Sequence, residues 1–415
     1  MSSSLSDTDT DTDTDSAVSV PGQIFKLKNG SIPAQGMILN RPGTYRFTED
    51  ITWRPDGTSP VAFRITCDGV VVDFSNFSLT LRGSRDVAQL ATAIVAVGDK
   101  TRFLSNIKVC CGTLKGFPLK ALVLAHVRDA VITRVVVGTA TAVAFAASAA
   151  SAAFSQSFLI INCSKVRVLW CAFDSLSTRI ASFCCVRVVS CTNVMVADVS
   201  IVKCRALAGC RFYAGVSVRS SLHVKVVKCR IGSIVAAPEP YTEPYTELYA
   251  EPGSIFAGVY LRECEAASVL HCRVSRIEVS DMMGRRAVVY GMYLQACARD
   301  SHVLNCDVHE IRAGGSSQHA VGVAIKTCKG LRVVQCAVSY VEAPKKENAI
   351  AFNFDAEDAE TVFDKCSVVK AGIAFSASSG GVDGEKFQNP CSVSSKSPIF
   401  TNCTVDGLPY KKTCK

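Results

Sequence analysis

The sequence predicts an all-β fold, a right-handed parallel β-helix solenoid with capped ends, from about residue 23 to the C-terminal segment. Two observations carry this prediction: an internal repeat with a period of about 30 residues, and two-residue alternation of apolar and polar side chains within each copy. A third is that valine dominates the repeated part of the chain, which favours strands over helices.

The repeat is clearest between residues 258 and 372, where four segments align with at most one gap. Successive anchoring cysteines stand at intervals of 34, 30 and 30 residues. The four copies are GVYLRECEAASVLHCRVSRI (258–277), GMYLQACARDSHVLNCDVHEI (291–311), GVAIKTCKGLRVVQCAVSYV (322–341) and FNFDAEDAETVFDKCSVVKAG (352–372). The anchors are Cys272, Cys306, Cys336 and Cys366, and weaker copies end at Cys171, Cys191, Cys204, Cys229 and Cys403.

Each copy contains short runs that alternate like a strand with one buried face. Val259 and Leu261, for example, alternate with Tyr260 and Arg262. Strands that recur in one direction must pair in parallel with their own copies. A lone rung buries about half a dozen side chains at roughly 1.5–3 kcal/mol each, against about 1–2 kcal/mol per ordered residue, so only stacked rungs are stable.

A family resemblance follows from the N-terminal part of the repeat. The segments PGTYRFTEDITW (42–53) and FRITCDGVVVDFSNFSLTLRG (63–83) resemble the opening of pectin-lyase-like β-helix proteins, with Val72–Asp73 and Leu79–Gly83 at the family's motif positions. The resemblance covers most of residues 36–375 and implies the fold. It does not imply a function, because this fold serves enzymes, adhesins and viral structural proteins, including those of large DNA viruses.

Composition divides the chain into segments. The Asp/Thr run at the N-terminus predicts a disordered acidic tail, and the tandem EPYTEPYTELYAEPG (239–253) predicts an exposed loop that either docks a partner or has no role. The expected segments are 1–20 (tail), 21–62 (N-terminal cap and first strands), 63–375 (rungs, with the insertion 236–254) and 376–415 (C-terminal loop, last rung and cap).

Targeting signals are few. Residues 1–20 lack the basic start and apolar run of a signal peptide, so a virion or a reducing compartment such as the cytoplasm is expected. The uncharged stretch Val135 to Ile161 is long enough to cross a bilayer. It is rich in Ala, Ser and Thr and lies between rungs, so we expect a rung with a loop or short helix there and no membrane span.

The charge balance suits an anionic partner. The net charge is +9, and the tail alone carries five aspartates, so the remainder is near +14. An acidic polysaccharide, nucleic acid or a negatively charged shell would fit, and solubility alone explains the charge equally well. Nucleic acid ranks last, since no aromatic-basic module accompanies the cations.

The 21 cysteines follow the repeat. No C-x-x-C spacing occurs, so the usual zinc and redox motifs are missing. Their recurrence at two bends predicts buried columns of small, weakly polar side chains. Rungs about 4.8 Å apart do not forbid disulfides, but the missing secretion signal favours reduced thiols. Cys391 and Cys414, outside the repeat, are candidates for a bridge or for surface reactivity.

A pectinolytic site is not predicted. The Asn-Thr-Asp, Asp-Asp and Gly-His-Gly signatures of polygalacturonases are absent, and the histidines find no repeated acidic partner. Rung alignment places Asp307 beside Arg273 and Glu310 beside Arg276, which predicts cross-strand ion pairs. Paired-carboxyl hydrolysis needs carboxyls within about 9.5 Å, and no such pair emerges from the aligned columns.

Two binding sites are candidates. Tyr260 and Tyr293 are predicted to stack in one outward column, a face for glycans or an anionic polymer, unless the tyrosines only stabilise the sheet. Arg262, Gln295 and Lys326 would stand beside them. The second candidate is calcium, at an acidic patch that otherwise is a solvated edge, and no other cofactor is expected. Its residues are Asp355, Glu357 and Asp358.

These observations favour a non-catalytic β-helix with a structural or attachment role. Its partners would be a glycan or other virion or surface proteins, and an oligomer is compatible with the fold. The alternative is a polysaccharide-active lyase or glycoside hydrolase with an atypical site. Fold analogy alone suggests the virion setting.

Overall fold

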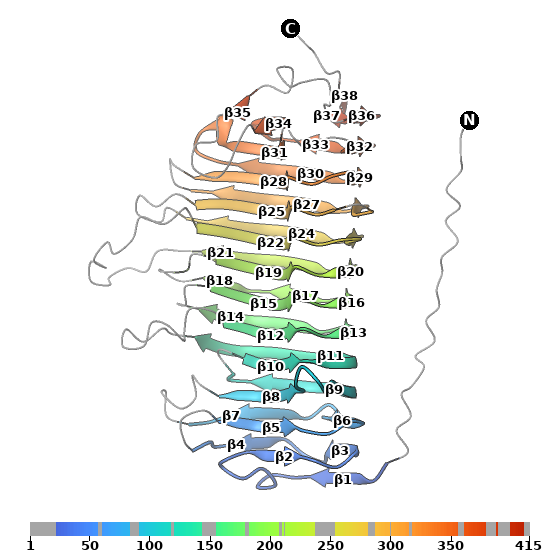
Figure 1. The fold of residues 1–415 in the computed structure, drawn as a ribbon. Helices are drawn as coiled ribbons and strands as arrows, with labels where there is room; N and C mark the ends of the chain where they lie inside the picture. The colour runs from blue at the N-terminus through green and yellow to red at the C-terminus, as the bar shows by residue number, and fades with distance from the viewer. Residues whose placement is uncertain are drawn as a thin grey trace, which may run out of the picture.

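The computed structural model confirms the right-handed parallel β-helix, with strands stacked along one axis from β1 to β38 (Figure 1). It describes residues 22–56, 60–83, 91–117, 120–142, 155–178, 182–206, 210, 212–236, 254–280, 287–298, 300–314, 318–355, 361–378, 387–388 and 399–410.

The strands form three columns, and each rung contributes to all three in turn. Column 1 is the 13-stranded sheet. Columns 2 and 3 are the two parts of the 25-stranded sheet, joined within β9 and β11, which run through both. Described rungs are numbered 1 to 12, from β2 to β34, by their column 1 strand.

Column 1 contains β2 (Met37–Leu39), β5 (Val61–Ile65), β8 (Thr92–Val97), β10 (Lys120–Ala125), β12 (Ser155–Ile161), β15 (Ser182–Val189), β19 (Phe212–Arg219), β22 (Ser254–Arg262), β25 (Ala287–Gln295), β28 (His319–Lys326), β31 (Ala349–Asp355) and β34 (Ile373–Ser378), with β35 (Phe387–Gln388) antiparallel on β34.

Column 2 contains β1 (Ile24–Leu27), β3 (Gly43–Phe47), β6 (Val70–Asp73), β13 (Ser164–Leu169), β16 (Thr192–Ala197), β20 (Leu222–Val227), β23 (Ser268–Leu270), β26 (His302–Leu304), β29 (Arg332–Val334), β32 (Val362–Asp364) and β36 (Ile399–Thr401). The strands shared with column 3 are β9 (Leu104–Lys115) and β11 (Val127–Ala142).

Column 3 contains β4 (Ile51–Trp53), β7 (Ser78–Leu81), β14 (Ala172–Thr178), β17 (Ser200–Val202), β18 (Cys204–Ala206), β21 (Arg230–Ala236), β24 (Arg273–Val279), β27 (Asp307–Ala313), β30 (Ala337–Glu342), β33 (Ser367–Val369) and β37 (Thr404–Val405), with β38 (Leu408–Pro409) antiparallel on β37. The helical content of the described residues is one 3-10 turn, η1 (Lys346–Asn348).

The predicted register between rungs is confirmed. Asp307 of β27 pairs with Ala337 of β30, and the Ala337 N–H donates to the Cys306 carbonyl at 2.9 Å. Cys306 and Cys336 therefore occupy the same bend in neighbouring rungs. Because the backbone bonds run from rung to rung, each strand satisfies its polar groups only when both neighbours are in place.

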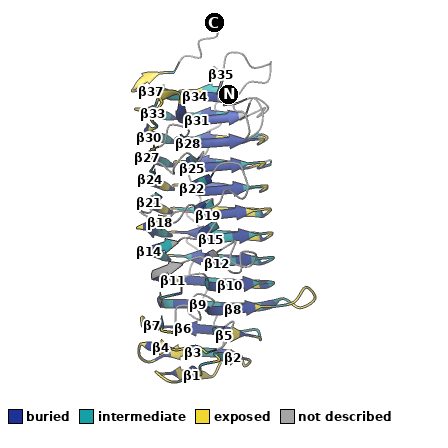
Figure 2. Ribbon diagram, turned by 90° about the vertical axis from the view of Figure 1, so that its left-hand side faces the viewer, coloured by how far each residue is buried: buried dark blue, intermediate teal, exposed yellow. Residues whose placement is uncertain are grey.

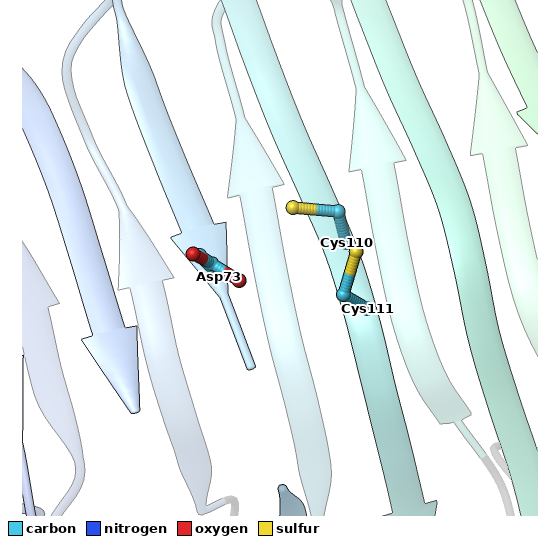
Figure 3. Close-up of side chains that lie close together, drawn as sticks. All are labelled: Asp73, Cys110 and Cys111. Carbon is cyan, nitrogen blue, oxygen red and sulfur yellow. The ribbon is translucent and has the colours of Figure 1, made fainter. Parts of the chain in front are cut away.

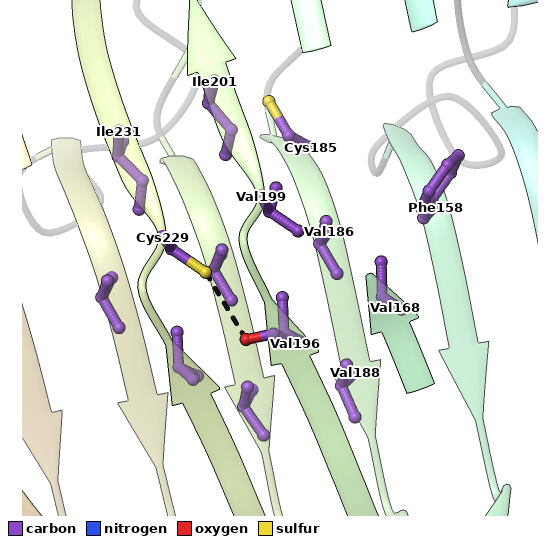
Figure 4. Close-up of a cluster of buried hydrophobic side chains, with 14 of the residues drawn as sticks. Phe158, Val168, Cys185, Val186, Val188, Val196, Val199, Ile201, Cys229 and Ile231 are labelled. Atoms are coloured by element: carbon purple, nitrogen blue, oxygen red, sulfur yellow. Dashed lines mark hydrogen bonds between the residues drawn. The ribbon is translucent and has the colours of Figure 1, made fainter. Parts of the chain in front are cut away.

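The inside of the coil is a continuous apolar core. Val259 and Leu261 are fully buried, as the alternation predicts, and so are Leu331 and Val333. Column 1 is buried along most of its length, whereas exposed residues gather toward the strand ends (Figure 2). The apolar side chains of successive rungs pack on one another across the three columns (Figure 4).

The bend between columns 2 and 3 has a left-handed residue followed by a cysteine. The left-handed residues share φ values of 50–52°. The buried cysteine thiol then donates to carbonyls of its own and the preceding rung: Cys229 Sγ lies 3.5 Å from both the Val227 and Val196 oxygens (Figure 4). The left-handed residues are Lys228, His271, Asn305, Gln335 and Lys365.

A second column lies at the bend between columns 1 and 2. Here the side chain of one rung accepts the backbone N–H of the rung before it. Cys297 N–H donates to Cys328 Sγ at 3.4 Å, and Cys191 N–H donates to Ser221 Oγ at 3.1 Å. Serine thus replaces cysteine at one position of this column. The side chains of the column therefore accept hydrogen bonds in addition to filling space. The column comprises Cys163, Cys191, Ser221, Cys264, Cys297 and Cys328.

The uncharged stretch from residue 135 to residue 161 contributes to two strands, β11 and β12, in different columns. None of the described residues form a helix long and apolar enough to cross a membrane. The predicted tail, the insertion residues 237–253, and Cys391 and Cys414 lie outside the described residues.

The hydrogen-bonding role of the first-bend column predicts a difference between two variants. Cys328→Ala removes the acceptor of the buried Cys297 N–H and should lower the free energy of unfolding by about 1–3 kcal/mol. Cys328→Ser keeps an acceptor there and should cost less than half as much. Chemical denaturation of both variants measures this, and equal losses would show that the thiol only fills space.

Candidate functional site

The predicted aromatic column is present but buried. The Tyr260 and Tyr293 rings stack with centroids 5.2 Å apart and planes 9° apart, and Arg262 pairs in register with Gln295. Gln295 in turn pairs with Lys326, as predicted. The rings belong to a second hydrophobic cluster on the outer face of column 1 and are only 8% and 3% exposed. Glycan binding here stays a prediction, for which the half-buried Arg262 and Gln295 are the accessible groups.

An ionic cluster adjoins this column. Glu263 lies 2.9 Å from Arg262 Nε and 3.6 Å from Arg219 Nε, and it accepts a hydrogen bond from the Ser220 hydroxyl at 2.8 Å. The Ser220 hydrogen bond, followed by the two arginines, lowers the pKa of Glu263. Because Glu263 is held ionised among cations, it is a structural partner for Arg262 and a poor general acid.

The predicted calcium patch lies mostly outside the described residues. Asp355 ends β31, and nothing is described of Glu357 or Asp358. Calcium binding at this patch therefore stays a prediction.

The predicted ion pairs on column 3 are partly confirmed. Arg273 Nε lies 3.3 Å from the Asp307 carboxylate, as expected from the register. Among the described residues, Glu310 instead pairs with His309 of its own rung, Oε1 to Nε2 3.2 Å. A groove of about 430 Å³ is lined by Arg273, His309 and Glu310, together with Arg230 and Arg276.

A groove that the sequence did not reveal runs along the outer face of column 2, over rungs 3 to 7. It measures about 470 Å³. One of its walls is a line of left-handed residues, one from each rung, with φ of 52–55°. The pairings on either side of them keep these residues in register. This polar line consists of Asn106, Asp129, Lys165, Asn193 and His223.

A second line of outward side chains, two residues further along each strand, completes this column 2 groove. Val131, Arg167, Met195 and Lys225 pair in register in successive rungs. Apolar and cationic side chains therefore alternate along the axis, with one step per rung of about 4.8 Å.

The column 2 groove is cationic. Its lining includes Lys165, Arg167 and Lys225 against a single carboxylate, that of Asp129. Lys165 Nζ lies 3.9 Å from Asp129 Oδ1, and both side chains are well exposed, so this pair is weak. Within the described part of the chain, neither Arg167 nor Lys225 forms an ion pair.

The column 2 groove continues at His223 into a larger hollow at the first bend. This first-bend groove, of about 650 Å³, crosses rungs 7 to 10. Two exposed carboxylates, those of Glu265 and Asp300, line it together with Lys329. Neither carboxylate forms an ion pair with an arginine among the described residues.

A small cluster of potential metal ligands lies near the N-terminal end of the stack. Asp73 of β6 pairs in register with Cys110 of β9, and the ligand atoms of Asp73, Cys110 and Cys111 all lie within 4.8 Å of one another (Figure 3). Burial, and then the neighbouring Cys111 and Asp73, raises the pKa of Cys110 to about 12.

Sequence reasoning missed both the column 2 groove and this cluster for one reason. Rungs 3 to 7 differ in length and match the repeat only weakly, so their outward columns could not be aligned. The adjacent pair Cys110–Cys111 was the available signal, but its neighbour Asp73 is 37 residues away from Cys110 and is placed there only by the register.

Comparison with known proteins finds similar solved structures but no relative by sequence. No protein-family model matches the sequence, and no curated protein matches it either. The A-module of the mannuronan C-5 epimerase AlgE6 of Azotobacter vinelandii is 8% identical, with 94% of this chain and 90% of that chain covered and a TM-score of 0.40.

Two further solved structures are similar at the same level. The catalytic domain of a GH87 α-1,3-glucanase, in complex with tetrasaccharides, is 10% identical over 94% of this chain and 64% of that chain, with a TM-score of 0.44. The tailspike of Escherichia coli bacteriophage HK620, in complex with a hexasaccharide, is 12% identical over 93% and 72%, with a TM-score of 0.27. These similar structures include carbohydrate-active enzymes and phage tailspikes.

The burial of the thiols predicts their reactivity. Burial raises the pKa of Cys171, Cys184 and Cys210 to about 12, so at pH 8, four units lower, about one thiol in 10,000 is ionised. Among the described cysteines, alkylation of the native protein at pH 8, mapped by mass spectrometry, should therefore label the half-exposed Cys67 and Cys111 first. Labelling of the buried columns at the same rate would contradict the stack.

Proposed function

We propose that this protein is a non-catalytic β-helix that binds an acidic glycan along the column 2 groove and acts as a structural or attachment element, with a virion or surface particle as its setting. One observation carries the proposal: the groove presents one polar side chain per rung in an axial line, with more cations than carboxylates.

The shape of the groove suits a linear polymer. Because its two lines of side chains repeat with the rungs, an extended chain lying parallel to the axis meets equivalent contacts about every 4.8 Å. The half-buried Val131 and Met195 can pack against the apolar faces of sugar rings, while Asn106 and Asn193 can exchange hydrogen bonds with hydroxyls.

The charge of the groove selects an acidic chain. Arg167 and Lys225 have no carboxylate partner in the described structure, so a carboxylate or sulfate of the ligand would supply it. On column 3, by contrast, Arg273 is already paired with Asp307. Since the groove is open to solvent, each such contact is screened and binding should weaken with salt.

Charge reversal tests the binding groove. Arg167→Glu and Lys225→Glu each replace an attraction by a repulsion, so either should weaken binding of a defined oligogalacturonate at least about tenfold, measured by calorimetry at low salt. Arg332→Glu is the matched control, because Arg332 is also exposed on column 2 but lies beyond the groove. Equal losses in the control, or none in the groove variants, would contradict the proposal.

A second candidate function, a polysaccharide lyase or glycoside hydrolase, is favoured by the first-bend groove. The carboxylates of Glu265 and Asp300 both line this groove, and His223 and Lys329 could act as bases.

Turnover separates the two functions. The binding proposal expects that the wild-type protein releases no products from acidic polysaccharides above the uncatalysed rate. Product formation that falls at least about 100-fold in both Glu265→Gln and Asp300→Asn would establish the enzyme instead. Chromatography of digests, with Glu278→Gln on column 3 as the control variant, measures this.

A further inference from the structure

The Asp73, Cys110 and Cys111 cluster has the composition of a soft-metal site. Its carboxylate comes from the end of β6 in rung 2, and both thiols come from the middle of β9 in rung 3 (Figure 3). Cys110 is 6% exposed and Cys111 is half-buried, so an ion could reach the cluster from one side. Carboxylate and thiolate are both zinc ligands.

A second, independent observation lies on the other side of the thiols. A cavity of about 70 Å³, lined by Cys110, Cys111 and Thr133, has room for about two waters. Thr133 pairs in register with Cys110 from rung 4 and is 9% exposed. Its buried hydroxyl has no hydrogen-bond partner. A buried hydroxyl facing a small cavity lacks the partner that a metal-bound water would provide.

The surroundings of the cluster favour a negatively charged complex. A divalent ion with two thiolates and one carboxylate carries a net charge of −1. Arg46 Nε lies 3.0 Å from Asp73 Oδ2, and Lys108 and Arg134 line the cavity beside the thiols. Asp73 Oδ1 also accepts the Ser75 N–H at 2.8 Å. Each carboxylate oxygen keeps a further lone pair for a metal.

We propose that Asp73, Cys110 and Cys111 bind one zinc-like divalent ion, with a water held by Thr133 as the fourth ligand, and that this ion links rungs 2 and 3 near the N-terminal end of the stack. Ligand atoms around tetrahedral zinc lie about 3.6–3.8 Å apart, so the cluster closes by about 1 Å on binding. The cavity beside the thiols shares Val131 and Arg167 with the lining of the column 2 groove. The ion would be held by other residues, so its binding does not depend on glycan binding.

Thiol protection tests the site in the unaltered, reduced full-length protein. One equivalent of Zn²⁺ should slow alkylation of Cys111 at least about tenfold, because a metal-bound thiolate is a poor nucleophile, as mapped by mass spectrometry. Cys67 is the internal control, since it is also half-buried but lies away from the cluster. An unchanged Cys111 rate, or equal protection of Cys67, would overturn the proposal.

A variant that keeps both thiols tests the carboxylate. Asp73→Asn should weaken Cd²⁺ binding about 10- to 100-fold, the range that is common when a supporting group of a metal site is removed. Cd²⁺ binding is measured from its thiolate absorption band. Asp198→Asn, an exposed aspartate in another rung, should bind one equivalent with the wild-type Kd. A wild-type Kd in Asp73→Asn would show that the ion is bound elsewhere.

Discussion

The in-register hydrogen bonding of each strand to its copy one rung away is the constraint on which the rest of this structure depends. It places Cys306 beside Cys336, Arg273 beside Asp307 and Tyr260 beside Tyr293, although each pair is about a rung apart in sequence. Side chains at equivalent positions of successive rungs therefore form a line parallel to the axis. Buried lines form the core and the bends, and outward lines form the surfaces that can meet a partner.

Cysteine serves this geometry at the bends. A strand that turns sharply leaves backbone groups without a ladder partner, and burying them unpaired is costly. The thiol is small enough to fit inside the coil, donates weakly to carbonyls of two rungs, and accepts an N–H at the first bend. Ser221, in the same column as Cys191, likewise accepts an N–H from the preceding rung and donates to a carbonyl of its own rung. The recurrence of cysteine with the rungs is therefore explained by the hydrogen bonds that its thiol makes at the bends.

The fold was predictable because the repeat can be recognised in a single sequence. The alternation at Val259 and Leu261 and the spacing of the anchoring cysteines define the rungs. The surfaces were predictable only where the repeat is regular, as for Arg273 and Asp307. Tyr260 and Tyr293 were correctly stacked, but they are buried in an apolar cluster on the outer face of column 1, which the alternation does not predict. Predicting the column 2 groove would have required the pairing register of the irregular rungs 3 to 7. The spacing of Lys165 and His223 in the sequence does not reveal that register.

The most direct test of a groove built by register is the dependence of affinity on ligand length. The groove spans five rungs, that is, four rung-to-rung steps of about 4.8 Å, so its ends lie about 19 Å apart. The Kd of oligogalacturonates of increasing length, measured by calorimetry, should fall stepwise until the chain spans that distance and then level off. A Kd that does not change with length, or that keeps falling well beyond it, would contradict an axial site of one contact per rung.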